Sequence, residues 1–301
     1  MVRQAHHERC LLDSRLRGND TVDTLRTSHE NYFLTILRTN YLIMPTSTPS
    51  QHISDAIRAA QSQDRPALVA FLTGGFPEPE HFHDLLCKVA DVADVVEIGV
   101  PFSDPMADGL TIQRSSRAAL AKGVSLRWIL NTLKSAEQKP KAPILLMSYL
   151  NPLLAFGFDQ LPTAARQAGV SGFIVPDLPY EESKDIQAAL HAHGLALIQM
   201  VTPVTPPDRL AMLCKQAEGF VYAVTMTGTT GKQVATPDEV LKYMDTVKSL
   251  SSVPICAGFG IRQREQVQAI KGHADGVVVG SALVEVLERG EDPVKFLNGL
   301  K

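Results

Sequence analysis

Short apolar runs alternate with longer amphipathic segments along most of this chain, and this alternation limits the folds that it can adopt. The runs are five to seven residues long, as buried strands are, and the segments between them carry apolar residues at helical spacing. Eight runs are predicted to be strands: Ala67–Thr73, Val95–Val100, Ile144–Tyr149, Gly172–Pro176, Leu195–Val201, Phe220–Thr225, Pro254–Gly258 and Gly276–Gly280. Helices are predicted over Glu80–Val92, Ser125–Glu137, Asp159–Ala168, Glu181–His193, Asp208–Gln216, Pro237–Leu250, Gln263–Ile270 and Ala282–Glu288.

Eight strand–helix units in succession match the repeat count and the usual length of a (β/α)8 barrel. An open doubly wound sheet is the alternative, but it usually has fewer strands and a Gly-x-Gly-x-x-Gly turn after the first. The turn after the first predicted strand reads LTGGFP, which lacks that pattern. No linker rich in Gly, Ser or charge follows residue 66, so we predict a single α/β domain with TIM-barrel architecture.

The first 43 residues differ from the rest of the chain. They mix arginines with acidic residues and show neither a helical nor a strand period. They lack the apolar core of a secretory signal and contain more acids than a transit peptide does. We predict that 1–43 is a disordered leader, or that translation starts at Met44, with the folded domain over 44–301. Ile53, Ala56, Ile57 and Ala60 then predict one extra helix before the barrel.

Charge and cysteine usage exclude several classes of partner. A net charge of −3 gives no reason to expect nucleic acid or an anionic membrane surface. No apolar run approaches the roughly 18 residues of a membrane span. The four cysteines are far apart and form no Cys-x-x-Cys pair, which is typical of reduced thiols in a cytoplasmic protein.

Two carboxylates are associated with the second predicted strand. Glu97 interrupts the apolar run Val95–Val100, and Asp108 lies in the loop that follows. Val96 and Ile98 alternate with Glu97, so we expect them to pack outward on helices while Glu97 faces the barrel interior. An ion-paired structural glutamate is the alternative interpretation. Because barrel enzymes place their chemistry at the carboxyl ends of the strands, this pair is the leading candidate for acid–base catalysis.

Glycine-bearing loops follow the last three predicted strands, in TMTGTTGKQ, AGFGI and VVGSA. Glycine lets backbone N–H groups approach an anion, and a helix N-terminus adds unpaired donors. Each loop alone could be a tight turn, but barrel enzymes commonly bind phosphate after strands seven and eight. The loops therefore predict a phosphate site. The absence of a Gly-x-x-x-x-Gly-Lys-Ser/Thr loop argues against a nucleoside triphosphate.

Other polar residues give weaker signals. The nine histidines are scattered and form no His-x-x-x-His pair with a nearby acid, so we predict no metal. Asp177, after the fourth predicted strand, could be catalytic or could form a turn. Lys232 lies in a glycine loop, whereas a Schiff-base lysine usually lies on a strand in apolar surroundings.

These motifs together resemble the tryptophan synthase alpha chain family, over about residues 50–300. VEIGVPFSDPMADGLTIQ is the most specific of them, and LTGGFP, MSYLNPL, GFIVPDLPYEES, TGTTGK, AGFGI and VVGSA follow in the order of the family. The resemblance implies a (β/α)8 barrel that cleaves indole-3-glycerol phosphate into indole and glyceraldehyde 3-phosphate. It also implies a pyridoxal-phosphate beta chain as partner in an α2β2 tetramer, with no cofactor on this chain.

The resemblance also assigns site residues. Glu97 and Asp108 match the two catalytic carboxylates, and Phe71 matches a residue that lines the indole pocket. The other matched substrate-binding residues are Tyr222, Thr230, Gly231, Gly260, Gly280 and Ser281. Two positions depart from the pattern: GGFP stands where many members have Gly-Asp-Pro, and Lys232 stands beside Gly231 where some members have an arginine.

The reaction agrees with these residue types. A retro-aldol cleavage needs an acid–base group near indole C3 and the side-chain hydroxyl, and an acceptor near the indole N–H; our hypothesis gives Glu97 the first role and Asp108 the second. Another phosphate-binding barrel, such as an indole-3-glycerol phosphate synthase or a phosphoribosyl isomerase, is the rival enzyme. A synthase would be expected to carry a lysine on a strand, and none of the predicted strands has one. A non-catalytic barrel that activates a partner enzyme and a stand-alone indole-releasing lyase remain alternatives.

Overall fold

The computed structural model describes residues 48–225, 237–258 and 260–301, and the account below concerns these residues. The predicted leader, 1–43, lies outside them and stays a prediction, as do the positions of Thr230, Gly231 and Lys232. The strands are β1 (Ala67–Thr73), β2 (Val95–Gly99), β3 (Ile144–Met147), β4 (Val170–Ile174), β5 (Ala196–Leu197), β6 (Gln199–Val201), β7 (Val221–Val224), β8 (Ile255–Gly258) and β9 (Gly276–Val279).

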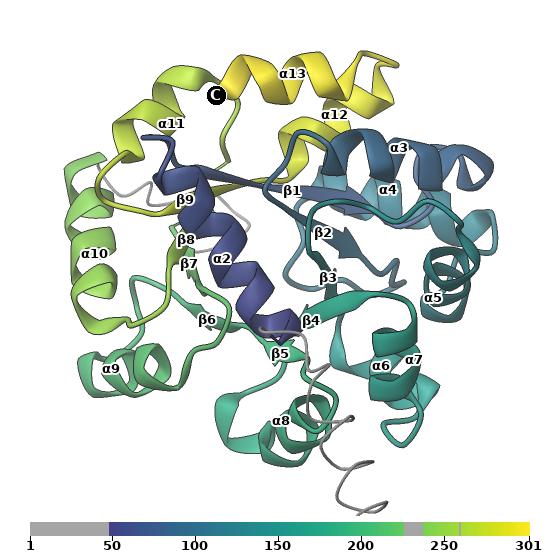
Figure 1. Ribbon diagram of the computed structural model, residues 1–301, viewed down its shortest axis with the longest axis horizontal. Helices are drawn as coiled ribbons and strands as arrows, with labels where there is room; N and C mark the ends of the chain where they lie inside the picture. Colours follow the sequence, from purple (N-terminus) through teal and green to yellow (C-terminus); the bar gives the residue numbers. More distant parts are fainter. Residues whose placement is uncertain (1–47, 226–236, 259) are drawn as a thin grey trace, which may run out of the picture. The chain divides into compact units, whose positions relative to one another are not determined.

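The strands form one parallel sheet in the order β5-β4-β3-β2-β1-β9-β8-β7-β6. Its two end strands, β5 and β6, are parts of one extended segment that Ile198 separates. The Ile198 amide donates to the Phe173 carbonyl at 2.9 Å, which continues the pairing with β4. The sheet therefore closes on itself, as Figure 1 shows. The predicted TIM barrel is confirmed, and the predicted strand 195–201 is divided in two.

Helices surround this barrel on its outer face (Figure 1). Three helices lie outside the predicted helix ranges: α4 (Leu110–Ala121), α6 (Leu150–Phe156) and α13 (Pro293–Leu300). Two predicted helices, over 80–92 and 181–193, begin instead with short 3-10 turns at Pro79–His81 and Tyr180–Glu182. The outer helices are α3 (Phe82–Ala90), α4 (Leu110–Ala121), α5 (Leu126–Ser135), α6 (Leu150–Phe156), α7 (Leu161–Gln167), α8 (Lys184–His191), α9 (Pro207–Gln216), α10 (Pro237–Leu250), α11 (Arg264–Ile270), α12 (Ser281–Glu288) and α13 (Pro293–Leu300).

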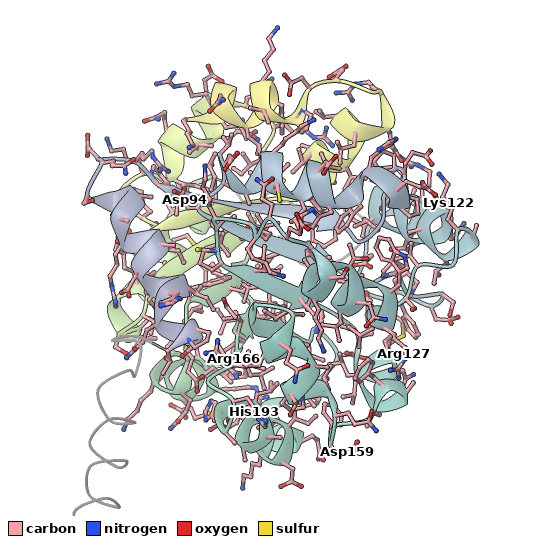
Figure 2. All side chains as sticks on the ribbon, turned by 45° about the vertical axis from the view of Figure 1, so that its right-hand side comes forward. Asp94, Lys122, Arg127, Asp159, Arg166 and His193 are labelled. Atoms are coloured by element: carbon pink, nitrogen blue, oxygen red, sulfur yellow. The ribbon has the colours of Figure 1, made fainter. Side chains whose placement is uncertain are left out.

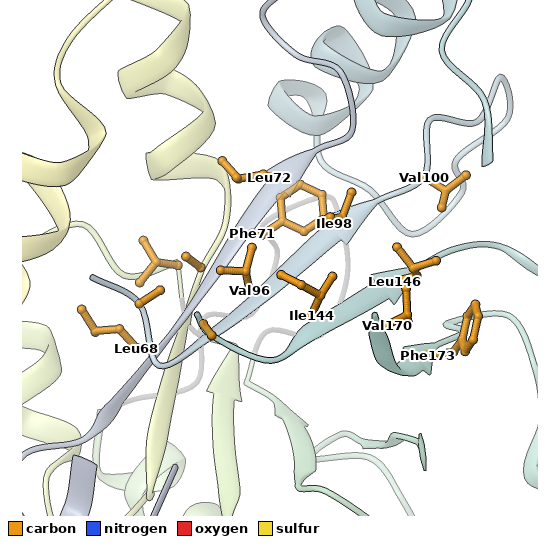
Figure 3. Close-up of a cluster of buried hydrophobic side chains, with 14 of the residues drawn as sticks. Leu68, Phe71, Leu72, Val96, Ile98, Val100, Ile144, Leu146, Val170 and Phe173 are labelled. Carbon is orange, nitrogen blue, oxygen red and sulfur yellow. The ribbon is translucent and has the colours of Figure 1, made fainter. Parts of the chain in front are cut away.

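The two faces of β2 have opposite environments. Val96, Ile98 and Val100 belong to the apolar cluster between the strands and the outer helices, part of which is drawn in Figure 3. Val95 belongs to a second cluster, inside the barrel. Because side chains alternate along a strand, Glu97 faces the interior with Val95. The predicted orientation of Glu97 is therefore confirmed.

Helix α2 (Pro49–Gln61) closes the amino end of the barrel and is the predicted extra helix. A capping box at Thr48 and Gln51 starts it, with Pro49 in the first turn. Ile53 and Ile57 are fully buried in the apolar cluster inside the barrel. In Figure 1, α2 crosses the centre of the ring of strands. The opposite, carboxyl end of the barrel is left open for a site.

Charged side chains fix some of the turns at the amino end. Asp94, labelled in Figure 2, forms a two-bond ion pair with Arg65, at 2.7 and 2.8 Å, and accepts from the Leu68 amide at 2.8 Å. This joins the start of β1 to the turn that leads into β2.

Within the described ranges, the helices lack the combination of length and apolar character that crossing a membrane requires.

Candidate active site

A cavity of about 350 Å³ opens at the carboxyl end of the barrel. Seven of the nine predicted site residues line it, contributed by β1, β2, β7 and the loops after β2, β8 and β9; the other two lie outside the described residues. Its lining consists of Phe71, Glu97, Ala107, Asp108, Gly109, Ile112, Met147, Pro176, Met200, Tyr222, Val224, Gly258, Gly260, Val278, Gly280 and Ser281.

Glu97 is fully buried at the inner end of this cavity. Among the described residues, neither of its carboxyl oxygens has a hydrogen-bond partner. Burial disfavours the charged carboxylate, and it raises the pKa of Glu97 to about 8. Among the described residues, Glu97 is therefore not a structural glutamate held in an ion pair, which was the alternative interpretation. A carboxyl with this pKa can both give and take a proton near neutrality.

Phe71 lies beside Glu97 in the register of β1 and β2. Its ring occupies space that a side chain at Gly99 would fill, since a Cβ there would lie 2.4 Å from the Phe71 Cζ. Gly99 follows Glu97 by two positions and shares its face of the strand. The glycine thus makes room for an aromatic wall next to the buried carboxyl.

Asp108 is half-buried in the loop between β2 and α4. Burial raises the pKa of Asp108 to about 6, and a hydrogen bond from the Tyr149 hydroxyl opposes part of that rise. The same hydroxyl accepts from the Ala107 amide at 2.9 Å. The side-chain amide of Gln113 donates to the Asp108 carbonyl at 2.9 Å. Tyr149 and Gln113 therefore fix the loop on either side of the carboxylate.

Tyr149 is a site residue that sequence reasoning missed. It ends the segment after β3, directly before α6, and its pKa is raised to about 12 by burial and by the nearby Asp108 carboxylate. Asp177 holds the next residue in place, because its carboxylate accepts from the Leu150 amide at 2.8 Å. Asp177 caps α6 and is absent from the cavity lining, which favours the turn interpretation over a catalytic one. Tyr149 lies within the motif MSYLNPL, and this motif was the feature of the sequence that could have identified it as a site residue.

Tyr222 forms the wall across from the two carboxylates. Burial raises the pKa of its hydroxyl well above the usual range, and the charges of Glu97, Cys256 and Asp108 add to the rise. Its ring lies against Gly258, where a Cβ would come within 2.7 Å of the Tyr222 Cε1. Gly258 therefore gives the tyrosine ring its place, much as Gly99 does for Phe71.

Glycines and a helix start form the outer part of the cavity. Gly260 has a φ of +64°, which glycine adopts without strain. Ser281 is the first residue of α12, and the Gly280 carbonyl accepts from the Leu283 and Val284 amides at 2.9 and 3.1 Å. The first N–H groups of a helix have no partner within it, so they can bind an anion.

The described residues contain no cluster of three or more His, Cys, Asp or Glu side chains that could hold a metal ion. The cavity lining instead combines two carboxyls, two aromatic rings and glycine-rich backbone. This arrangement suits a flat apolar ligand that carries a phosphate and reacts by proton transfer.

Comparisons with known proteins give the family. The profile of the tryptophan synthase alpha chain matches residues 57–298. The alpha chain of Nitratidesulfovibrio vulgaris strain DP4 is 43% identical over 242 residues, which are 80% of this chain and 94% of that protein. The alpha chain of Desulfovibrio desulfuricans is 43% identical over 248 residues, 81% of this chain and 97% of the relative. This chain belongs to the tryptophan synthase alpha chain family.

Solved structures agree with the family. Tryptophan synthase subunit alpha from Legionella pneumophila superposes with a TM-score of 0.74 at 31% identity, covering 83% of this chain and 96% of that one. A chain of tryptophan synthase from M. tuberculosis has the same TM-score at 33% identity, covering 83% and 97%. The resemblance seen in the sequence is confirmed, and with it the protein is a lyase of tryptophan biosynthesis.

One departure from the pattern of the tryptophan synthase alpha chain family has a structural counterpart. Phe76 stands in GGFP where many members carry an acid, and its side chain is buried in the outer apolar cluster. A carboxylate could not occupy this place without losing its hydration. The turn after β1 is therefore fixed here by apolar packing.

Proposed function

We propose that this chain cleaves indole-3-glycerol phosphate into indole and glyceraldehyde 3-phosphate, with Glu97 as general acid and base and Asp108 as acceptor of the indole N–H. These roles are assigned because the cavity contains two carboxyls that differ in burial and in pKa. Glu97 is buried with a pKa raised to about 8, and Asp108 is half-buried with a pKa raised to about 6. Near pH 7 the first is mainly neutral and the second mainly charged.

The proton balance of the reaction closes on these two residues. The neutral Glu97 carboxyl gives its proton to indole C3, and the positive charge that develops on the ring is stabilised at N1–H by the Asp108 carboxylate. The Glu97 carboxylate then takes the proton of the side-chain hydroxyl. The bond between C3 and the side chain breaks, its electron pair returns to the ring, and the aldehyde forms. Glu97 ends in its starting state, so no co-reactant is needed.

The remaining cavity residues are proposed to hold the substrate. Phe71 and Tyr222 would flank the indole ring, and the backbone at Gly260, Gly280 and Ser281 would bind the phosphate. Thr230 and Gly231 lie outside the described residues and stay predicted substrate contacts.

We propose the tryptophan synthase beta chain as partner, in an α2β2 tetramer with pyridoxal phosphate on the beta chain and no cofactor on this one. Met106 and Leu110 support a partner surface, because both flank Asp108 and these apolar residues are 82% and 75% exposed. The cytoplasm is the proposed location and 44–301 the proposed lyase domain.

Indole release by the purified full-length chain, measured with and without a beta chain, tests the function. We expect release from indole-3-glycerol phosphate, and a loss of roughly 10²–10⁴ in rate for Glu97→Gln with substrate binding largely kept. Near-normal release by Glu97→Gln would refute the assigned role. A chain that releases no indole under either condition, yet accelerates a beta chain, would instead be the non-catalytic activating barrel.

A further inference from the structure

Three segments of the proposed site meet at one glutamate, Glu285, outside the cavity. Glu285 lies on α12, one turn after Ser281, so the two side chains project from the same side of the helix. Its carboxylate contacts the start of α4 on one side and the loop after β8 on the other. The first of these segments follows Asp108, and the second follows Gly260.

The bonds of Glu285 are specific in geometry. Arg262 donates through both terminal nitrogens, at 2.6 Å to Oε2 and 2.9 Å to Oε1. Thr111 donates its hydroxyl to Oε1 at 3.2 Å. A two-bond guanidinium–carboxylate pair fixes orientation as well as distance. Thr111 is three residues beyond Asp108, and Arg262 is two beyond Gly260.

A second glutamate on α12 provides a comparison. Glu288 binds Arg114 of α4 through two bonds, at 3.0 and 3.2 Å, and thus also joins α12 to α4. The contacts of Glu288 given by the structure do not extend to the loop after β8. The two glutamates therefore differ in their links. Glu285 binds Thr111 and Arg262 of the Gly260 loop directly, whereas Glu288 binds Arg114, which donates to the Thr111 hydroxyl at 3.5 Å.

These pairs contribute little to the stability of the fold. The side chain of Glu285 is 23% exposed and that of Arg262 is 52% exposed, and exposed ion pairs of this kind are worth little in folding free energy. What the Glu285 contacts do is hold three segments in one arrangement. Two of those segments carry proposed phosphate contacts, and the third, the start of α4, follows the Asp108 loop.

We propose that Glu285 is a positioning residue that couples the phosphate end of the cavity to the Asp108 loop. An anion bound at Gly260 and Ser281 restricts the motion of the loop after β8 and of the start of α12. Because Glu285 binds both Arg262 in that loop and Thr111 in α4, the start of α4 is restricted as well. The coupling is reciprocal, so an indole on Asp108 favours anion binding by the same factor. This inference rests on the proposed function, since it takes Asp108 as the indole contact and the glycine loops as the phosphate site.

The test measures the affinity of the full-length chain for indole, without and with saturating inorganic phosphate. In the wild-type protein we expect phosphate to tighten indole binding. Glu285→Gln should weaken that effect by about 2- to 30-fold. Thr111→Val should weaken it similarly while leaving the affinity for phosphate alone unchanged, because the pair with Arg262 remains. Glu288→Gln, the matched control, should keep the coupling of the wild type.

Turnover gives a second measurement. Glu285→Gln should raise KM and lower kcat for indole-3-glycerol phosphate together, with a thermal unfolding midpoint equal to that of Glu288→Gln. Equal coupling in wild type and Glu285→Gln, or an equal loss in Glu288→Gln, would overturn the inference and leave the proposed function standing. A wild-type chain that neither binds phosphate nor cleaves the substrate would overturn both.

Discussion

Phe71 and Glu97 lie side by side on the parallel strands β1 and β2, so an aromatic ring adjoins a buried carboxyl at the cavity. The Glu97 carboxyl is fully buried, and burial favours its neutral form. Asp108 faces the same cavity but keeps a tyrosine hydroxyl as a hydrogen-bond donor. The two carboxyls therefore titrate apart, with pKa values raised to about 8 and about 6.

The first prediction concerns the pH dependence of indole release. Asp108 must be charged and Glu97 must be neutral at the start of the reaction, so kcat/KM should rise through about pH 6 and fall through about pH 8. Initial rates of the full-length chain in buffers of constant ionic strength measure the profile. A rate that keeps rising above pH 9 would contradict a neutral Glu97 as the initial acid.

The second prediction concerns Tyr149. Its hydroxyl lowers the pKa of Asp108, so Tyr149→Phe should raise that pKa further and move the acid limb of the profile to higher pH. At pH 6 the rate should fall by roughly 10-fold, as for loss of a hydrogen bond to a charged group. The loss should be smaller at pH 7.5, where most of the Asp108 remains ionised.

Tyr243→Phe is the matched control for that variant. The Tyr243 hydroxyl is buried on α10 with no hydrogen-bond partner among the described residues, so its removal should leave the profile unchanged. An acid limb that stays in place in Tyr149→Phe would show that the hydroxyl does not act on Asp108.

The sequence predicted those parts of the site that follow from strand period and loop position. Alternation along β2 placed Glu97 inside the barrel, and the order of the strands placed Asp108 and the glycine loops at one end. The contact between Tyr149 and Asp108 could not be predicted in this way. It joins residues 41 positions apart and depends on where α6 starts, which the cap from Asp177 determines.

The division of the predicted strand 195–201 into β5 and β6 also could not be predicted from the sequence. The residues of this segment are apolar throughout except for Gln199, and they suit a continuous strand. The interruption at Ile198 arises where β5 pairs with β4 and β6 with β7, so the closure of the whole barrel decides it. Burial likewise determines how far the pKa values of Glu97 and Asp108 rise, and burial is a property of the assembled site.

The third prediction concerns Gly99. A methyl group there would lie 2.4 Å from the Phe71 Cζ, so Gly99→Ala should push the ring into the indole pocket. Overpacking of this kind costs about 1–3 kcal/mol, and we expect KM to rise by about 5- to 100-fold. Steady-state kinetics with indole-3-glycerol phosphate measure the change. Gly299→Ala on α13 is the control, because a Cβ there has no neighbour within 4 Å. An unchanged KM in Gly99→Ala would mean that Phe71 does not border the substrate.

The fourth prediction concerns the cost of Glu97 to folding. Its pKa is about 8 in the folded protein and near 4.5 in the unfolded chain. Between these values the folded state keeps a proton that the unfolded state releases, so the free energy of unfolding falls as pH rises through this window. Each pKa unit corresponds to about 1.4 kcal/mol, and the loss from pH 4.5 to pH 8 is on the order of a few kcal/mol.

Glu97→Gln removes this titration while keeping the shape of the side chain. Its stability relative to the wild type should therefore increase from pH 5 to pH 8 and then level off, as measured by urea unfolding at each pH. Glu137→Gln, which removes an exposed carboxylate, controls for the change in net charge. If the stability difference between Glu97→Gln and wild type were the same at pH 5 and pH 8, the Glu97 carboxyl would have to be solvated or paired in the folded protein, and its role as a neutral acid would fail with it.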